Sequence, residues 1–295
     1  MEYIKSAVLG VVEGITEWLP ISSTGHMILV DEFFTLKTQN GANFTNFFLV
    51  AIQLGAILAV IMLYFKKIWP LHLKSTAVAP FYKGENIGGF KNFCNNYVYM
   101  DKIILWLKIL VASIPAAILG ILFDEKIDSM LTGNSRVYIV ASTLILYGIL
   151  FIVVESMKKK ESILNTDDIT FKLAFIIGLI QCLALIPGTS RSGTTILGAT
   201  LLGLGRTAAA EFSFFLSIPA MAGGSGIKLI DYLSAGNSFT NEELMVLFVG
   251  MAVAFIVSVL AIKFLISYIK RHDFKAFGYY RIVLGIVLLA YFLLR

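Results

Sequence analysis

Charged residues are scarce in this chain. Lysine, arginine, aspartate and glutamate make up 15% of its 295 residues, whereas a typical soluble domain contains about a quarter. Hydrophobic residues make up 58%, and the mean hydropathy is +0.82. This balance excludes an ordinary soluble domain and predicts an all-α integral membrane protein.

Cysteine is nearly absent as well. Cys94 lies in a polar loop and Cys182 in an apolar segment, so a disulfide is not expected. The opening residues lack the cationic start of a cleaved signal peptide. The net charge of +5 comes from short basic clusters between apolar segments. Such clusters orient membrane proteins, so the charge does not imply a nucleic-acid partner.

Several apolar segments are long enough to cross a bilayer, which takes about 20 residues. Two others, about 4–30 (the first hairpin) and 171–200 (the second hairpin), are interrupted by proline and by Ser, Thr and Gly. Non-helical backbone survives at membrane depth only where protein or water covers it, so we expect two re-entrant helix–turn–helix hairpins. The six expected spans are residues 46–65, 103–123, 136–155, 211–231, 245–268 and 279–294.

The charges predict a topology. Lys66–Lys67, Lys158–Lys160 and Lys270–Arg271 each follow an expected span, and the positive-inside rule places them in the cytoplasm. The acidic loops at 124–128 and 242–243 then lie outside. With six spans, both termini are expected outside, the first hairpin enters from outside, and the second enters from the cytoplasm.

The two hairpins are alike in sequence. At an offset of 168 residues, Gly10-Val-Val-Glu13 aligns with Gly178-Leu-Ile-Gln181, and Ser22–His26 aligns with Ser190–Thr194. Related hairpins that enter from opposite faces indicate an inverted-topology repeat, whose site usually lies near the midplane. The expected organisation is a single membrane domain, 1–295, with pseudo-repeats at about 1–156 and 170–295.

The tip of the first hairpin carries ionisable groups. Glu13 and Glu17 are four residues apart and share one face of a helix. Pro20 ends that helix, and the run Ser-Ser-Thr-Gly-His follows at residues 22–26. Ionisable residues at membrane depth are costly and usually functional, which favours a reaction site.

The tip of the second hairpin, Pro-Gly-Thr-Ser-Arg-Ser-Gly-Thr-Thr at residues 187–195, opens a helix. The free amides and positive dipole end of a helix favour an anion, and Arg191 can bind phosphate oxygens as a bidentate fork. The tip is not a Walker loop, because the Gly-Lys-Ser/Thr ending is missing. The predicted phosphate-binding residues are Ser22, Thr24, Ser190, Arg191, Ser192 and Thr195.

The first tip allows more than one chemistry. Glu13 and Glu17 can hold a divalent metal, Mg²⁺ or Ca²⁺, partly through phosphate, or they can share a proton. His26 suits general acid–base catalysis or a phosphoenzyme. Ser22 or Ser23 can attack phosphorus with His26 as the base, and the spacing does not decide among these alternatives.

These motifs resemble those of the bacterial undecaprenyl-diphosphatase family, also called the bacitracin-resistance protein family. The motifs are Gly10–His26 and Pro187–Thr195, and the flanking runs Ala51–Gly55 and Phe212–Pro219 are also similar. The resemblance covers essentially the whole chain. It implies a phosphatase that converts undecaprenyl diphosphate to undecaprenyl phosphate and inorganic phosphate. That reaction recycles the lipid carrier for peptidoglycan synthesis and confers bacitracin tolerance.

The resemblance also implies roles for residues. Glu13 and Glu17 match the family's Glu-x-x-x-Glu pair, Ser23 is the usual nucleophile candidate, and His26 and Arg191 complete the catalytic set. It further implies dependence on a divalent metal and a site that opens to the outer face of the bacterial plasma membrane. The implied partners are undecaprenyl diphosphate and membrane lipids, and a homodimer is left open.

Plainer interpretations exist for single residues. A lone terminal acid can cap a helix, Arg191 can extend to an interface, and some of the hydroxyls must satisfy the backbone of a broken helix. The run Gly-Gly-Ser-Gly at 223–226 is expected to allow close helix packing. The rival function is a polyprenyl-phosphate carrier or flippase that uses the same anion site, because broken helices in inverted repeats are typical of transporters.

Overall fold

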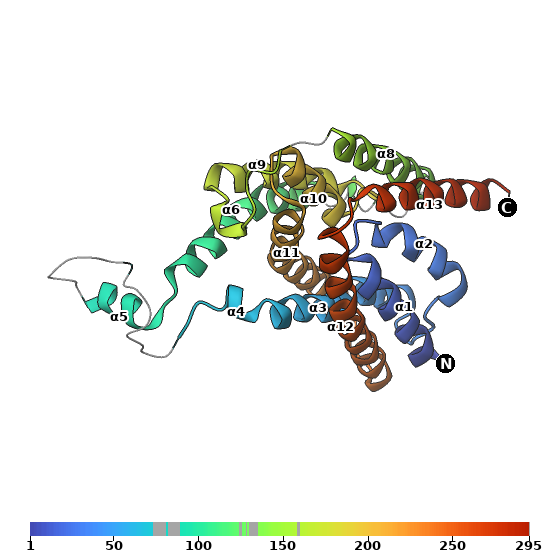
Figure 1. The fold of residues 1–295 in the computed structure, drawn as a ribbon. Helices are drawn as coiled ribbons and strands as arrows, with labels where there is room; N and C mark the ends of the chain where they lie inside the picture. The colour runs from blue at the N-terminus through green and yellow to red at the C-terminus, as the bar shows by residue number, and fades with distance from the viewer. Residues whose placement is uncertain are drawn as a thin grey trace.

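The fold consists of helices and the segments that connect them (Figure 1). Within the residues that the structure describes, β-structure is limited to two isolated bridges, Leu71 with Val98 and Ile163 with Leu204. The computed structural model describes residues 1–72, 81, 89–123, 126–127, 129, 135–157 and 160–294.

Six of the described helices are long and apolar enough to cross a membrane, which makes this a multi-pass membrane protein. They overlap all six predicted spans, and most begin a few residues earlier. Polar residues that start a helix fall outside an apolar window: Thr240, for example, forms a capping box with Glu243. The six helices are α3 (Gly41–Leu63), α6 (Met100–Leu122), α8 (Arg136–Ser156), α11 (Arg206–Ser234), α12 (Asn241–Ile269) and α13 (Lys275–Leu293).

Two pairs of shorter helices occupy the predicted hairpin segments. α1 (Glu2–Thr16) packs against α2 (Ser23–Phe34), and α9 (Phe171–Gln181) packs against α10 (Arg191–Leu201). Each of these helices has 15 residues or fewer, short of the about 20 that a span requires. The lengths fit hairpins, while their entry from opposite faces stays a prediction.

The two hairpin turns have the same backbone geometry. Ser22 and Ser190, which the sequence offset pairs, have φ angles of 74° and 70°. Each caps the helix that follows: Ser22 Oγ accepts from the amide of Gly25 at 3.4 Å, and Ser190 Oγ accepts from the amide of Gly193 at 3.2 Å. A positive φ is uncommon for serine and costs energy, so its occurrence at both sites agrees with the sequence repeat.

Paired glycines let each hairpin approach a spanning helix. A methyl group on Gly10 would lie 2.6 Å from the carbonyl oxygen of Gly250 in α12, and one on Gly178 would collide with that of Ala112 in α6. Lipid tails are as apolar as leucine, so helices in membranes associate through close backbone packing of this kind.

The glycines at 223–226 do not behave this way, and the prediction of close packing there is wrong. A methyl group on Gly223, Gly224 or Gly226 would meet nothing within 4 Å. Only Ser225 points inward, and its hydroxyl donates to the carbonyl of Val50 in α3 at 3.1 Å. The glycines therefore lie on an open face of α11.

The first tip is anchored by a tryptophan. Trp18 is fully buried, and its ring meets that of Phe214 in α11 edge-on, with centroids 5.4 Å apart. Because Trp18 follows Glu17 directly, this contact places the carboxylate beside α11.

Two further helices, α4 (Phe65–Ile68) and α5 (Gly89–Tyr97), border the loop between the first two spans. In Figure 1, α4 continues from α3, and α5 lies at the far left, away from the hairpins. The charged residues Asp124, Glu125, Asp128, Lys158 and Lys159, which entered the topology prediction, lie outside the described residues.

Candidate active site

The two acids of the first tip are both buried. Glu17 keeps helical φ and ψ angles of −71° and −39°, so it follows Glu13 by about one turn. Glu13 is 1% exposed and Glu17 is 7% exposed. Within the described part of the chain, Oε1 of Glu13 has no hydrogen-bond partner. An unpaired buried carboxylate oxygen is unfavourable, which marks a place where a cation or a donor group can bind.

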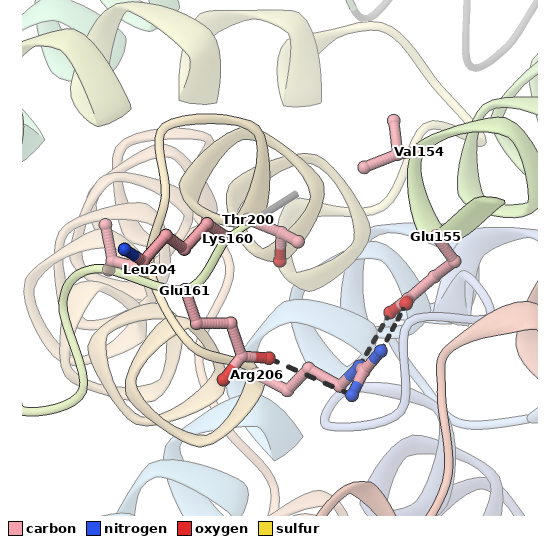
Figure 2. Close-up of a pocket in the computed structure, with 7 residues that line it drawn as sticks. All are labelled: Val154, Glu155, Lys160, Glu161, Thr200, Leu204 and Arg206. Atoms are coloured by element: carbon pink, nitrogen blue, oxygen red, sulfur yellow. Dashed lines mark hydrogen bonds and ion pairs between the residues drawn. The ribbon is translucent and has the colours of Figure 1, made fainter. Parts of the chain in front are cut away.

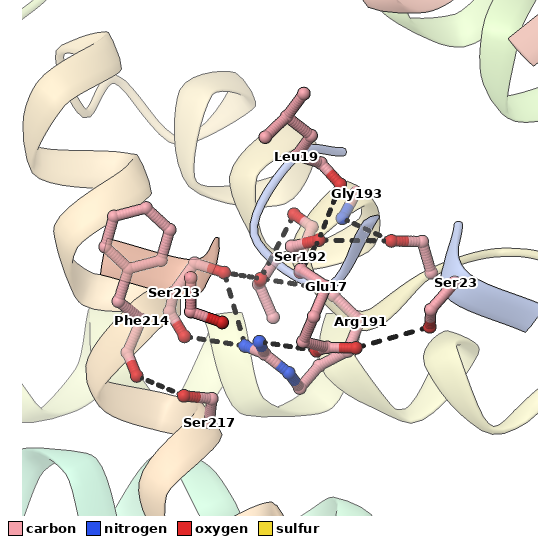
Figure 3. A network of polar contacts seen from close by, with 12 residues as sticks. Glu17, Leu19, Ser23, Arg191, Ser192, Gly193, Ser213, Phe214 and Ser217 are labelled. Atoms are coloured by element: carbon pink, nitrogen blue, oxygen red, sulfur yellow. Dashed lines mark hydrogen bonds and ion pairs between the residues drawn. The ribbon is translucent and has the colours of Figure 1, made fainter. Parts of the chain in front are cut away.

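Glu17 connects the two hairpins. Its Oε1 accepts from Nη2 of Arg191 at 3.0 Å, and its Oε2 accepts from the hydroxyl of Ser23 at 3.3 Å. Figure 3 shows the carboxylate between the guanidinium and the serine. The structure thus brings an acid and a hydroxyl of the first hairpin together with a cation of the second.

Arg191 is held in place by α11. Its Nη1 donates to the carbonyl of Ser213 at 2.7 Å, and its side chain is 13% exposed. Among the described residues, its Nε is buried and has no partner. One donor of the fork is therefore left for an anion beside Glu17.

Hydroxyl groups of the second tip bind the first tip and α11 (Figure 3). Ser192 Oγ donates to the backbone carbonyl of Glu17 at 3.0 Å. Thr195 Oγ1 donates to the carbonyl of Arg191 at 2.8 Å and lies 2.6 Å from the hydroxyl of Ser213. Two of the predicted phosphate ligands thus make bonds within the protein.

The other predicted hydroxyl ligands lie in the first turns of α2 and α10. Ser22 and Ser190 use their hydroxyls as helix caps. Thr24 is half-buried in the first turn of α2. Binding of phosphate by these residues stays a prediction.

His26 bonds at both ring nitrogens. Nδ1 lies 2.7 Å from the carbonyl oxygen of Ser22, and Nε2 lies 2.6 Å from the hydroxyl of Tyr280 in α13. The expected pairing of His26 with a serine hydroxyl is not the one seen, because Ser23 donates to Glu17. In this arrangement Glu17 is the group placed to accept the proton of Ser23.

Arg281 of α13 binds the backbone of both tips. It is 0% exposed; Nη1 donates to the carbonyl of Pro20 at 3.2 Å, and Nη2 donates to those of Gly188 and Thr189, each at 2.9 Å. These carbonyls replace the water that a guanidinium loses on burial. Arg281 therefore fixes one hairpin tip relative to the other.

Three residues of the site escaped prediction. Arg281 did give a signal, because an arginine inside an expected span is a functional candidate by default. Ser213 lies within the similar run Phe212–Pro219 but was not singled out there, and Tyr280 gave no signal, since single serines and tyrosines are ordinary in apolar helices. Only the packing of α11 and α13 onto the tips reveals them.

Glu13 and Glu17 can hold a metal ion only if the substrate supplies further ligands. The described residues contain no group of three or more His, Cys, Asp or Glu side chains that could bind a metal ion. Glu13 and Glu17 provide two carboxylates, one with an unpaired oxygen. Mg²⁺ is usually bound by one or two carboxylates together with substrate phosphates, so the pair fits a shared site of this kind.

A separate polar pocket of about 280 Å³ lies at the other end of α10 (Figure 2). There Arg206 donates to Glu155 at 2.7 Å and lies 3.8 Å from Glu161. Thr200, near the end of α10, also lines the pocket, whereas Arg191 begins that helix. None of the predicted site residues lines this pocket, and its arginine is already paired with acids, so we assign the chemistry to the hairpin tips.

Comparison with known proteins identifies the family of this chain. Residues 6–287 match the family described as bacitracin resistance protein BacA. The chain is 51% identical to undecaprenyl-diphosphatase 1 of Clostridioides difficile (strain 630), over 100% of this chain and 97% of that protein. It is also 51% identical to an undecaprenyl-diphosphatase of Enterococcus faecalis, over 98% and 96% of the two chains. The chain belongs to the bacitracin resistance protein BacA family.

Proposed function

We propose that this protein is a membrane phosphatase that hydrolyses undecaprenyl diphosphate to undecaprenyl phosphate and inorganic phosphate. One observation carries the proposal: the carboxylate of Glu17 contacts both the hydroxyl of Ser23 and the guanidinium of Arg191. A hydroxyl, its proton acceptor and an anion-binding cation are the parts that phosphoryl transfer needs. The names of its relatives support this substrate, and the reaction would recycle the lipid carrier and give bacitracin tolerance.

The reaction begins with phosphate binding. The unpaired Nε of Arg191 and the amides at the start of α10 bind oxygens of the diphosphate. Ser23 Oγ, or a water in its place, attacks the terminal phosphorus while Glu17 accepts the proton. The bond from that phosphorus to the bridging oxygen breaks, and undecaprenyl phosphate leaves. If Ser23 is the nucleophile, water then releases phosphate from the serine.

A divalent metal, Mg²⁺ or Ca²⁺, would be held by Glu13 and Glu17. Such an ion would neutralise charge on the diphosphate. The unpaired Oε1 of Glu13 supports this role, because it offers a hard oxygen ligand at a buried position.

We place the site in the bacterial plasma membrane, open to its outer face, with both termini outside. The basic cluster Lys270–Arg271 between α12 and α13 and the acidic start of α12 at Glu242 and Glu243 support this orientation. Reaction of a membrane-impermeant label with a cysteine introduced at Glu242 in intact cells tests it. Labelling of a cysteine at Arg271 instead would reverse the topology.

The test of function is phosphate release by the purified protein in detergent with undecaprenyl diphosphate and Mg²⁺. Glu17→Gln, Ser23→Ala and Arg191→Ala are expected to lower kcat by at least about a hundredfold, because each removes a base, a nucleophile or an anion ligand. The exposed Glu242→Gln, Ser156→Ala and Arg271→Ala are the matched controls. Normal turnover in all three site variants would refute the assignment.

The carrier remains the rival. A protein that binds the lipid diphosphate with full dependence on Arg191, yet releases no phosphate, would be a carrier and not a phosphatase. The contact between Ser23 and Glu17 favours hydrolysis, because transport needs no hydroxyl beside a base.

A further inference from the structure

The contacts of His26 determine its tautomer. A backbone carbonyl can only accept a hydrogen bond, so the Nδ1 that faces the carbonyl of Ser22 at 2.7 Å must carry a hydrogen. In the neutral ring, Nε2 then has a lone pair and accepts. The hydroxyl of Tyr280, 2.6 Å away, is therefore the donor.

Tyr280 also sets the plane of the imidazole. The two rings are nearly parallel, at 7°, with centroids 5.6 Å apart. Tyr280 is 45% exposed, so its ring is not needed to fill the protein core. Its two contacts with His26, one from the ring and one from the hydroxyl, orient the histidine together with the bond from Nδ1 to Ser22.

The oriented imidazole supports a strained turn. Ser22, whose carbonyl it binds, has the unfavourable φ of 74°, and the next residue is Ser23. Such backbone persists only where the surroundings hold it in place. The chain of bonds from Tyr280 through His26 to Ser22 ties this turn to α13.

The second tip lacks this support. Thr194 stands where the first repeat has His26, and its Oγ1 is buried without a partner in the described structure. The carbonyls of Gly188 and Thr189 are bound by Arg281 instead. Tyr280 thus supports only the first tip, through His26, whereas the next residue, Arg281, binds both tips directly.

We propose that Tyr280 is a positioning residue of this active site, acting through His26 to hold Ser23 in place for attack. The inference deepens the proposed function and rests on it. The hydroxyl of Tyr280 donates to Nε2 of His26, so that Nδ1 stays protonated and the turn at Ser22 stays fixed.

A double-mutant cycle tests this path. Tyr280→Phe is expected to lower kcat about five- to tenfold, the effect of one lost hydrogen bond, and to change KM less than about twofold. In a His26→Ala background, Tyr280→Phe should lower kcat no further, because the histidine through which Tyr280 acts is absent. Tyr279→Phe, at a neighbouring exposed position, is the matched control. Equal losses in both backgrounds, or none in the wild type, would overturn the proposal.

Nuclear magnetic resonance of ¹⁵N-labelled histidine gives a readout that does not depend on catalysis. The chain has only three histidines, so assignment by substitution is practical. His26 should show protonated Nδ1 and unprotonated Nε2, and Tyr280→Phe, but not Tyr279→Phe, should alter the Nε2 signal. A protonated Nε2 in the neutral wild-type ring would overturn the proposal. Failure of the phosphatase assay with the expected spectrum would refute only the proposed function.

Discussion

Replacing Arg281 by methionine tests whether one side chain fixes the two hairpin tips. The variant keeps an unbranched apolar stem but leaves three backbone carbonyls, those of Pro20, Gly188 and Thr189, without their donor. A buried acceptor that loses its partner costs about 1–3 kcal/mol, which gives an upper range of about 3–9 kcal/mol. Burying the guanidinium itself costs energy, which offsets part of this gain. We therefore expect Arg281→Met to lower the free energy of unfolding by about 3 kcal/mol.

Catalysis should be impaired as well as folding. The bonds of Arg281 reach both sides of the contact between Glu17 and Arg191, and a displacement of about 1 Å can cost about a hundredfold in rate. We expect Arg281→Met to unfold at lower temperature in detergent and to lose at least about a hundredfold in kcat. Arg281→Lys should recover part of both losses, because an ammonium can reach some of the carbonyls.

Arg271→Met, in the exposed turn between α12 and α13, serves as the control for loss of a positive charge. The reasoning would be refuted if Arg281→Met kept the unfolding temperature and the turnover of the wild type. If the variant were less stable but kcat of its folded fraction were unchanged, Arg281 would contribute to stability and not to catalysis.

Two further predictions concern the metal and the glycines. Chelation should abolish phosphate release, and added Mg²⁺ should restore it. Glu13→Gln, but not Glu242→Gln, should raise the Mg²⁺ concentration that gives the half-maximal rate. If Glu13→Gln left that concentration unchanged, Glu13 would not be a metal ligand. Gly10→Ala should destabilise the protein by about 1–3 kcal/mol in thermal unfolding, because the added methyl would meet Gly250. Gly223→Ala should be neutral or stabilising by up to about 1 kcal/mol, because it meets open space and favours helix; equal losses at the two positions would contradict this account.

The parts of the fold that depend on local composition were predictable. Hydropathy marks a spanning helix because most of its residues face lipid or an apolar neighbour, and the six spans were found with small errors at their ends. Proline and glycine marked the breaks near Pro20 and Pro187 for the same local reason. The offset of 168 even paired Ser22 with Ser190, which share a rare backbone conformation.

The contacts within the site were predictable only in part. Residue types that suit phosphate chemistry singled out Glu17, Arg191 and a choice between Ser22 and Ser23, and the family resemblance implied Ser23. The hydrogen-bond partner of each residue could not be predicted, because hydrogen bonds between hairpins depend on packing angles. Thus Ser23 meets Glu17 and not His26, and His26 meets Tyr280, 254 residues away in the chain.

The positive φ angles of Ser22 and Ser190 limit which side chains these two positions can accept. Each position requires a backbone that glycine adopts most readily and an oxygen that glycine lacks. A β-branched replacement would clash, and glycine would lose the cap, so few single mutations are tolerated at Ser22 or Ser190. Resistance to an inhibitor whose binding depends on the shape of these two turns would therefore arise slowly.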